Sequence, residues 1–239
     1  MEVILETERL VLRRFTAADV DPLFVLHNDP DVMRFLTGGE LVSRREVERE
    51  YRERFAGHGY WVAGERVTGE FLGWFALHPT VGRDPDEVEL GYRLRKAAWG
   101  RGYATEGAHA LIRTGFAEMG VRCVWAQTMA VNLASRRVME KAGLVLARVF
   151  YPAWEDPLPG AEHGEVESAM ERAAWERREE AGRKGANGGR LGVDPAPATF
   201  RTVGRSVPGR GDAEITEPRS PSNTPLPGVA HRASRGEGP

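Results

Sequence analysis

The segment Trp99-Gly100-Arg101-Gly102-Tyr103-Ala104-Thr105-Glu106 carries the clearest chemical signal in the chain. Its two glycines lie one residue apart directly before a helical pattern, so no side chain shields the backbone N–H groups of the turn. Those N–H groups, together with the positive end of the helix, can hold a phosphate or pyrophosphate. On the residues alone, the glycines could equally serve only the backbone geometry of a tight strand-to-helix turn.

Two other phosphate-binding motifs are absent from the sequence. No Gly-x-x-x-x-Gly-Lys-Ser/Thr occurs anywhere, and Gly100-Arg101-Gly102 lacks the third glycine of a dinucleotide-binding fingerprint. The turn also comes too late in the chain for that fingerprint. These two classes of nucleotide site are therefore excluded.

The elements on either side of the turn follow from the periodicity of apolar residues. Before it, apolar residues alternate with Glu89, Gly91 and Arg93, which predicts a half-buried strand over 87–94. After it, apolar residues recur at helical spacing and predict a helix over 104–119. A later helix begins at Asn132, whose side chain suits an N-cap, and ends at Gly143.

The same reading along the chain predicts a mixed α/β protein with helices packed on a sheet. Strands are expected over 10–12, 60–63, 71–77, 87–94, 121–129, 144–150 and 165–170. Helices are expected over 16–26, 32–36, 43–55, 104–119 and 132–142. On the helix over 43–55, the pairs Glu48–Arg52 and Glu50–Arg54 stand at i, i+4 spacing, and we interpret this charge run as a solvated helix face.

Overall composition narrows the classes of protein. The 239 residues carry a formal net charge of −2, which gives no electrostatic case for nucleic acid as the main partner. The lone Cys123 excludes an internal disulfide framework, and the histidines are scattered without metal-ligand spacing, so no metal is expected. No apolar run approaches the roughly 20 residues of a membrane span, and the N-terminus is too charged for a signal peptide. We expect a cytoplasmic protein with no membrane partner.

The composition divides the chain into two unlike parts. Residues 176–239 contain 11 Gly and 8 Pro, with Phe200 as the single aromatic residue. Such a segment cannot bury enough apolar surface to offset its ordering entropy, so we expect a disordered tail with a net charge of +3. Residues 1–175 hold all the tryptophans and a net charge of −5. The sequence therefore predicts one folded domain over 1–175.

Three linked motifs resemble a known family. They are Glu89-Leu90-Gly91-Tyr92-Arg93-Leu94, the glycine turn, and Asn132-x-x-Ser135-Arg136-Arg137-Val138-Met139-Glu140-Lys141-x-Gly143. In this order and spacing they resemble the GNAT superfamily of acyl-CoA-dependent N-acetyltransferases, in its ribosomal-protein (RimJ/RimL-like) branch. Thr7-Glu8-Arg9-Leu10-x-Leu12-Arg13 is similar to the first strand of that branch. The resemblance covers residues 6–175, with Ala97 standing where the family usually has Gln or Arg.

The resemblance implies the acyl-CoA N-acyltransferase fold, a mixed and mostly antiparallel central sheet flanked by helices. It also implies an acetyl-CoA site in a V-shaped gap between the strands over 87–94 and 121–129. After Gly100, the backbone N–H groups of residues 101–105 would receive the pyrophosphate. Main-chain groups of Leu94 and Arg95 would pair with the pantetheine arm, and Asn132 would contact it from the other side. The residues of the turn are Arg101, Gly102, Tyr103, Ala104 and Thr105.

The implied chemistry is direct acyl transfer, in which an amine loses its proton, attacks the thioester and releases a thiolate that is protonated. Ser135, one helical turn after Asn132, is assigned as the acid, with a plain first-turn hydroxyl as the alternative. Glu89 is assigned as the base or as the residue that positions it, and Glu87 on the same strand face is its rival. A backbone N–H near Tyr92 would stabilise the carbonyl oxygen.

The acceptor implied by the resemblance is a primary amine, either a protein N-terminus or a small amine such as an aminoglycoside or polyamine. His163 and Glu165, beside the loop over 151–163, are candidates to face the amine. A catalytically silent acyl-CoA-binding module is the alternative function. A sheet edge or the loop over 151–162 could support a homodimer.

Overall fold

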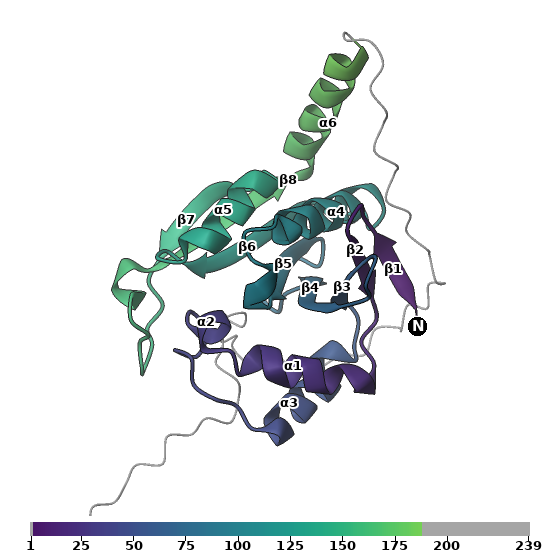
Figure 1. The fold of residues 1–239 in the computed structure, drawn as a ribbon. Helices are drawn as coiled ribbons and strands as arrows, with labels where there is room; N and C mark the ends of the chain where they lie inside the picture. Colours follow the sequence, from purple (N-terminus) through teal and green to yellow (C-terminus); the bar gives the residue numbers. More distant parts are fainter. Residues whose placement is uncertain (1, 188–239) are drawn as a thin grey trace, which may run out of the picture.

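The computed structural model describes residues 2–187, which form one eight-stranded sheet with helices on both faces (Figure 1). The strand order is β1-β2-β3-β4-β5-β6-β8-β7, and every neighbouring pair is antiparallel except β5 and β6. The expected mixed, mostly antiparallel sheet is thereby confirmed. The strands are β1 (Val3–Glu6), β2 (Leu10–Arg13), β3 (Tyr60–Glu65), β4 (Phe71–Pro79), β5 (Glu87–Leu94), β6 (Cys123–Met129), β7 (Val145–Phe150) and β8 (Glu165–Glu171).

The helices form two layers around the sheet. Figure 1 shows α1, α2 and α3 below it, α4 and α5 above it, and α6 projecting from the end of β8. A π-helical turn, Tyr51–Phe55, directly continues α3. The helices are α1 (Val20–His27), α2 (Pro30–Met33), α3 (Arg44–Glu50), α4 (Tyr103–Ala117), α5 (Leu133–Ala142) and α6 (Arg172–Asn187).

Alternation along the strands gives each helical layer its own hydrophobic core. In β4, Phe75 and Leu77 pack beneath α4, whereas Trp74 and Ala76 belong to the core beneath α1 and α3. In β5, the apolar residues face the α4 layer and Glu89, Gly91 and Arg93 face the other layer, as their alternation predicts. The sheet therefore separates an α4/α5 side from an α1/α3 side.

Close packing of α4 on the sheet gives the first prediction. A Cβ added at Gly107 would lie 2.3 Å from Cζ of Phe75, which is fully buried. We expect Gly107→Ala to destabilise the protein by about 1–3 kcal/mol, because the overlap outweighs the better helix propensity of alanine. Urea unfolding would measure this, with Gly182→Ala in α6, where the added methyl meets nothing within 4 Å, as the control. An unchanged midpoint for Gly107→Ala would contradict this packing.

Several local signals act as the sequence predicts. The Ser43 hydroxyl accepts from the Glu46 N–H at 3.3 Å, and the Ser43 N–H donates to the Glu46 carboxylate at 2.7 Å, which completes a capping box on α3. Gly143 ends α5 with φ 94°, a left-handed conformation that glycine adopts without a Cβ clash. These short-range interactions fix the ends of the helices.

The two ends of the described chain differ from expectation. The strand β1 was not predicted; it pairs with β2 at the edge of the sheet. The helix α6 covers residues 176–187, where composition predicts no structure, because Trp175 stacks on Phe116 with ring centroids 5.3 Å apart and Arg178 donates to the Gly143 carbonyl. The remainder of the predicted disordered tail, 188–239, lies outside the described residues.

The predicted solvated face of α3 is partly wrong. Glu50 does pair with Arg54 at 3.1 Å, but Glu48 pairs with Arg44 instead of Arg52. The Glu50 side chain is only 6% exposed and lies against His27 of α1, which is fully buried. This carboxylate therefore belongs to the interior between α1, α3 and the sheet.

Candidate active site

The parallel strands β5 and β6 separate along their length. Their pairing consists of Glu87 with Cys123, Val88 with Val124, and Glu89 with Trp125. Beyond Glu89, β5 continues to Leu94 and pairs with β4 alone, while β6 continues to Met129 and pairs with β8 alone. The sheet thus opens into a gap whose closed end lies at Glu89.

Backbone groups of β5 line this gap in an alternating pattern. Leu94 faces Gly73 in the register, and the Arg95 N–H donates to the Leu72 carbonyl at 2.8 Å. Because alternate residues of an antiparallel pair turn their backbone groups to opposite sides, those of Tyr92 and Leu94 point toward β6. The Leu94 carbonyl already accepts the Trp99 indole N–H at 2.7 Å. The backbone groups of Leu94 therefore point into the gap, whereas the Arg95 N–H is occupied by its hydrogen bond to Leu72 in the sheet.

The glycine turn has the backbone geometry that only glycine adopts easily. Gly100 has φ 70°, and Gly102 has φ 84° at the N-cap position of α4. The N–H groups of the first helical turn have no intrahelical partners and point out of the helix end. Within that turn the Tyr103 side chain is buried, while Ala104 and Thr105 are partly exposed and Arg101 is exposed. The start of α4 can therefore receive an anion through its main chain.

The turn is held in place by a network that the sequence reasoning missed. The Glu106 carboxylate accepts hydrogen bonds from the Thr7 hydroxyl at 2.6 Å, the Arg9 N–H at 2.8 Å and the Arg9 Nε at 2.7 Å. Arg9 also donates from Nη1 to the Arg101 carbonyl at 2.8 Å. These contacts fasten the start of β2 to the N-terminus of α4. Thr7, Arg9 and Glu106 all lie within the quoted motifs, but their contact spans almost a hundred residues and leaves no local signal.

Asn132 acts as the N-cap of α5. Its Oδ1 accepts from the Ser135 N–H at 3.2 Å, and its Nδ2 donates to the Thr128 hydroxyl at 3.0 Å. The capping function expected from its residue type is therefore confirmed. The same two bonds hold the beginning of α5 against the end of β6, on the far side of the gap from β5.

A pair of hydroxyls connects β5 to α5 across the gap. The Tyr92 hydroxyl lies 2.9 Å from Oγ of Ser135 and donates to the Ser135 carbonyl at 3.1 Å. Burial raises the pKa of Tyr92 to about 12, so its proton stays on at neutral pH. From the sequence, only the backbone N–H near Tyr92 was predicted to act in the reaction. The signal that could have revealed its side chain is its place in the alternating strand, on the face that α5 covers.

The two rival carboxylates of β5 occupy different environments. Glu89, only 8% exposed, lies at the closed end of the gap and accepts from the Thr80 hydroxyl at 3.3 Å. Glu87 lies before the strands separate and forms ion pairs with Arg122 and Arg83. The structure therefore brings Glu89, and not Glu87, to the edge of the gap.

The two candidate acceptor residues differ in burial. Glu165 lies in β8 with 3% of its surface exposed, and in the register it is on the same sheet face as Glu89. His163 lies in a short turn before β8 with 63% of its side chain exposed, beside Glu162. The buried Glu167, also on this face, is paired with Arg148 and Arg83. Buried carboxylates therefore line the Glu89 side of the sheet, whereas His163 is exposed.

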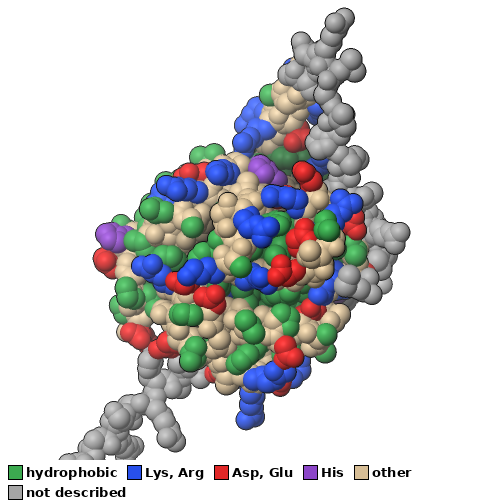
Figure 2. Space-filling view, in the orientation of Figure 1, with side chains coloured by type: hydrophobic (Ala, Val, Ile, Leu, Met, Phe, Trp, Pro, Cys, Tyr) green, Lys and Arg blue, Asp and Glu red, His purple; other side chains and the backbone are tan. Residues whose placement is uncertain are grey.

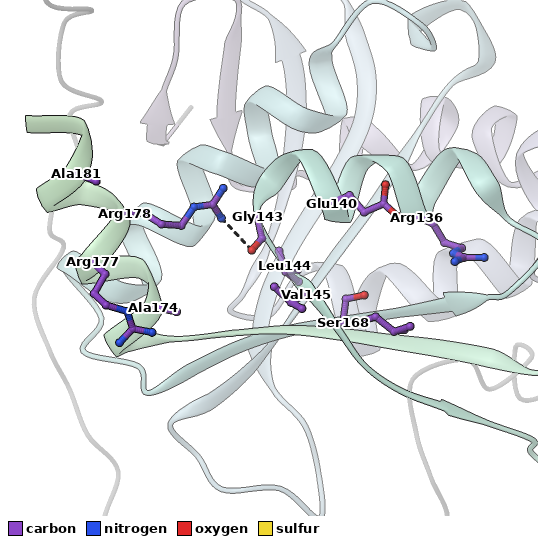
Figure 3. Close-up of a pocket in the computed structure, with 11 residues that line it drawn as sticks. Arg136, Glu140, Gly143, Leu144, Val145, Ser168, Ala174, Arg177, Arg178 and Ala181 are labelled. Atoms are coloured by element: carbon purple, nitrogen blue, oxygen red, sulfur yellow. Dashed lines mark hydrogen bonds between the residues drawn. The ribbon is translucent and has the colours of Figure 1, made fainter. Parts of the chain in front are cut away.

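Two hollows in the described residues differ from the gap in their lining. The first, of about 660 Å³, is bounded by α5, β7, β8 and α6, with Arg136, Gly143 and Ser168 among its lining residues (Figure 3). Arg178 donates to the Gly143 carbonyl on one side of it (Figure 3). A second hollow of about 310 Å³ lies near Leu5, Leu77 and Leu111. Neither contains the glycine turn or the Tyr92–Ser135 pair.

Over residues 2–187, no group of His, Cys, Asp and Glu is arranged to hold a metal ion. No helix in the same range is long and apolar enough to cross a membrane. Basic and acidic side chains are interspersed over the face shown in Figure 2.

Comparisons with known proteins agree with this geometry. The FsC-acetyl coenzyme A-N(2)-transacetylase of Aspergillus fumigatus is 34% identical over 164 residues, which cover 64% of this chain and 69% of that protein. A GNAT-family acetyltransferase structure from Bacillus anthracis superposes with a TM-score of 0.62 at 23% identity, covering 71% of this chain and 99% of that one. A spermidine N-acetyltransferase from Vibrio cholerae, solved with CoA and spermine, has a TM-score of 0.57 at 14% identity, covering 70% and 97%.

The sequence profile of the acetyltransferase (GNAT) domain matches residues 9–145, which include the glycine turn, Glu89, Asn132 and Ser135. The matched segment is more than half of the chain. The chain belongs to the GNAT family of acyl-CoA-dependent N-acetyltransferases.

Proposed function

We propose that this protein transfers the acetyl group of acetyl-CoA directly to a primary amine while both substrates are bound. The observation that carries the proposal is the separation of β5 from β6 beyond Glu89, with a hydroxyl pair and a carboxylate on its walls. An extended pantetheine arm fits between two strands that no longer pair, because their backbone groups are then available to it. The name of the Aspergillus relative, which states acetyl transfer from acetyl coenzyme A to a nitrogen, supports the same reaction.

Acetyl-CoA binding is assigned mainly to the backbone. The N–H groups of residues 101–105 would receive the pyrophosphate at the start of α4, where the helix dipole favours negative charge. Leu94 would pair with the pantetheine arm from β5, with Arg95 fixing the strand, and Asn132 would hold the opposite wall. A Cβ at Gly100 would have nothing within 4 Å, whereas at Gly102 it would lie 3.2 Å from Nη2 of Arg9, so both glycines keep added bulk out of the turn.

Catalysis is assigned to groups at the two sides of the gap. Glu89 would take the proton of the acceptor ammonium, directly or through water, and the free amine would then attack the thioester carbonyl. The backbone N–H of Tyr92 would stabilise the negative oxygen of the tetrahedral intermediate. Ser135 would return a proton to the departing thiolate, with Tyr92 as its hydrogen-bonded neighbour at 2.9 Å.

Removing the Ser135 hydroxyl tests the acid. We expect Ser135→Ala to lower kcat about 10- to 100-fold, because the thiolate loses its proton donor, while acetyl-CoA affinity stays within about twofold. Thiol-release assays measure kcat, and calorimetric titration measures the affinity for acetyl-CoA. Ser168→Ala, on β8 and lining the α6 hollow, is the matched control. Equal kcat values for Ser135→Ala and the wild type would reject this assignment.

Beyond the family, we place the chain in the ribosomal-protein (RimJ/RimL-like) branch, acting in the cytoplasm. The support is the opening motif, whose Thr7 and Arg9 contact Glu106. The acceptor would be a protein N-terminus or a small amine, and the buried carboxylates on the Glu89 side of the sheet favour an ammonium group there. Residues 1–175 would form the catalytic domain. The exposed edge strand β7, which carries Val145 and Val149, is the surface where a homodimer would form.

Thiol release from acetyl-CoA in the presence of an amine panel tests the function. Acetylated product, detected by mass spectrometry, would establish the transferase. Acetyl-CoA binding without release for any amine or N-terminal peptide would instead support the silent binding module.

A further inference from the structure

A group of buried polar side chains without hydrogen-bond partners lies between α1, α3 and the sheet. Within residues 2–187, the buried side-chain atoms lacking a partner include both ring nitrogens of His27, one oxygen of Glu50 and the indole nitrogen of Trp74. Nδ1 of His27 is 3.2 Å from Oε2 of Glu50 without hydrogen-bonding geometry. Buried polar groups without partners are costly and rare in folded proteins, so their concentration here calls for an explanation.

Arg93 extends into the same space from β5. It is directly opposite Trp74 in the register of β4 and β5, and its guanidinium carbon is 5.2 Å from the centroid of the Trp74 ring. Its side chain makes no hydrogen bond to any other residue in the described part of the chain. Desolvation lowers the pKa of Arg93 to about 10, so it remains a cation. A charged fork with five donors is thus left without a protein acceptor, and because Arg93 is partly exposed, a ligand from solvent can reach it.

Within residues 2–187, the one carboxylate near Arg93 is already shared with another arginine. Glu50 already accepts from Arg54 at 3.1 Å, and Arg54 also donates to the Tyr60 hydroxyl at 2.9 Å. Desolvation lowers the pKa of His27 to about 4, which keeps its ring neutral at pH 7. Glu89 also acts electrostatically on Arg54, whereas, among the described residues, Glu50 is the one carboxylate that acts on Arg93. The Arg93 donors without acceptors therefore suit a ligand that supplies anionic oxygens.

The position of Arg93 relates it to the reaction. Arg93, Gly91 and Glu89 project from the same face of β5, on the α1/α3 side. Residues two apart on one strand are separated by roughly 6.6 Å, so Arg93 lies about that far from Gly91 and about twice as far from Glu89 along β5. With the side chains of Arg93 and Glu89 extended from the same face, an acceptor whose amine and carboxylate lie several bonds apart can contact both. A planar guanidinium binds a carboxylate through two parallel hydrogen bonds, which fixes its orientation.

We propose that the acceptor is a primary amine that also carries a carboxylate, and that Arg93 binds this carboxylate with the indole N–H of Trp74 as a second donor. This inference rests on the proposed function and narrows its substrate class to amines of amino-acid type. A purely cationic amine would leave Arg93 without a partner and would place its own charge near a cation.

Pairs of amines that differ only by the carboxylate test the proposal. L-ornithine with putrescine, L-tyrosine with tyramine, and L-phenylalanine with phenethylamine are assayed with acetyl-CoA and the full chain. We expect the carboxylated member of at least one pair to have the higher kcat/KM. Turnover of the decarboxylated members with equal or higher kcat/KM in every pair would overturn the inference and leave the transferase intact. Absence of thiol release with every amine would overturn the transferase and the inference together.

Variants then assign the preference to Arg93. We expect Arg93→Gln to raise KM for the preferred carboxylated amine about 10- to 100-fold, and to change the decarboxylated partner less than about twofold. Arg93→Lys keeps the charge but loses the planar guanidinium, so its KM for the carboxylated amine should lie between those of the wild type and Arg93→Gln. Trp74→Phe keeps the ring and removes the N–H donor, so it should give a smaller loss with the same selectivity.

The exposed Arg52, just after α3, supplies the charge-matched control as Arg52→Gln. Thermal unfolding of each variant separates misfolding from altered recognition, and Arg93→Lys remains informative if Arg93→Gln does not fold. Equal KM changes for both members of a pair, or no change for either in a folded variant, would overturn the assignment.

Discussion

Replacing Gly102 with valine is expected to weaken acetyl-CoA binding at least about 100-fold. The Gly102 backbone has φ 84°, where a β-branched residue is strained by about 1–3 kcal/mol. Relief of that strain would rotate the N–H groups at the start of α4 away from the pyrophosphate. An added Cβ would also lie 3.2 Å from Nη2 of Arg9, the residue that holds the turn. Calorimetric titration with acetyl-CoA measures the loss.

Gly120→Val is the matched control for this prediction. Gly120 has φ 73°, so valine meets the same backbone restriction, and an added Cβ has nothing within 4 Å. Gly120 lies just after α4, at the opposite end of that helix from Gly102. We expect Gly120→Val to lower stability without changing acetyl-CoA affinity. If both variants bind acetyl-CoA as tightly as the wild type, the main-chain pyrophosphate site is wrong.

The local backbone geometry of the segments assigned to acetyl-CoA was predictable because its signals are local. A positive φ at Gly102, the cap at Asn132 and the left-handed Gly143 each depend on residues within one turn. Strict alternation along β5 also predicts which of its side chains face each layer. These features follow from backbone sterics and hydrogen bonding, which a short stretch of sequence encodes.

Contacts between distant segments were not predictable in the same way. The Arg9–Glu106 pair, the Tyr92–Ser135 hydroxyls and the buried Glu50 each join elements far apart in the chain. Glu50 illustrates the difficulty. Its predicted ion pair with Arg54, at i, i+4 spacing, is present, but the spacing does not indicate that His27 of α1 packs against the same carboxylate. Tertiary packing decides whether a charged residue on a helix is solvated or buried.

Composition misplaced the end of the folded part for a related reason. The count of Gly and Pro over 176–239 averages the helical residues 176–187 together with the Gly- and Pro-rich sequence after them. Trp175 and Arg178 anchor α6 to Phe116 and Gly143, so its first turns gain contacts that an average over composition does not register. Because the end of the fold depends on two specific contacts, the average composition of sixty-four residues could not locate it.

Glu89→Gln is expected to lower kcat about 10²- to 10⁴-fold, the usual contribution of a general base. The amide keeps the size of the side chain and can still interact with the Thr80 hydroxyl, which lies 3.3 Å from the carboxylate. Acetyl-CoA affinity should stay within about twofold, because the cofactor contacts are assigned elsewhere. Thiol-release kinetics with saturating amine measure the change in kcat.

Glu87→Gln distinguishes the base from its rival on the same strand face. Glu87 is paired with Arg122 and Arg83 before the strands separate, so its neutralisation removes ion pairs but no group at the gap. We expect kcat within about threefold of wild type, since partly exposed ion pairs contribute little. The two variants remove the same charge two residues apart, so a change in net charge cannot account for a difference between them.

The pH dependence of kcat/KM separates a proton-accepting function of Glu89 from a structural one. If the carboxylate takes the proton from the acceptor, Glu89→Gln should flatten the acidic limb of the profile, because the group whose ionisation is needed is gone. A structural function would lower the whole profile and keep its shape. A large loss of kcat/KM in Glu87→Gln with little loss in Glu89→Gln would assign the base to Glu87, although Glu87 lies where β5 and β6 are still paired. The opposite pattern would show that the reaction needs a carboxylate where β5 leaves β6.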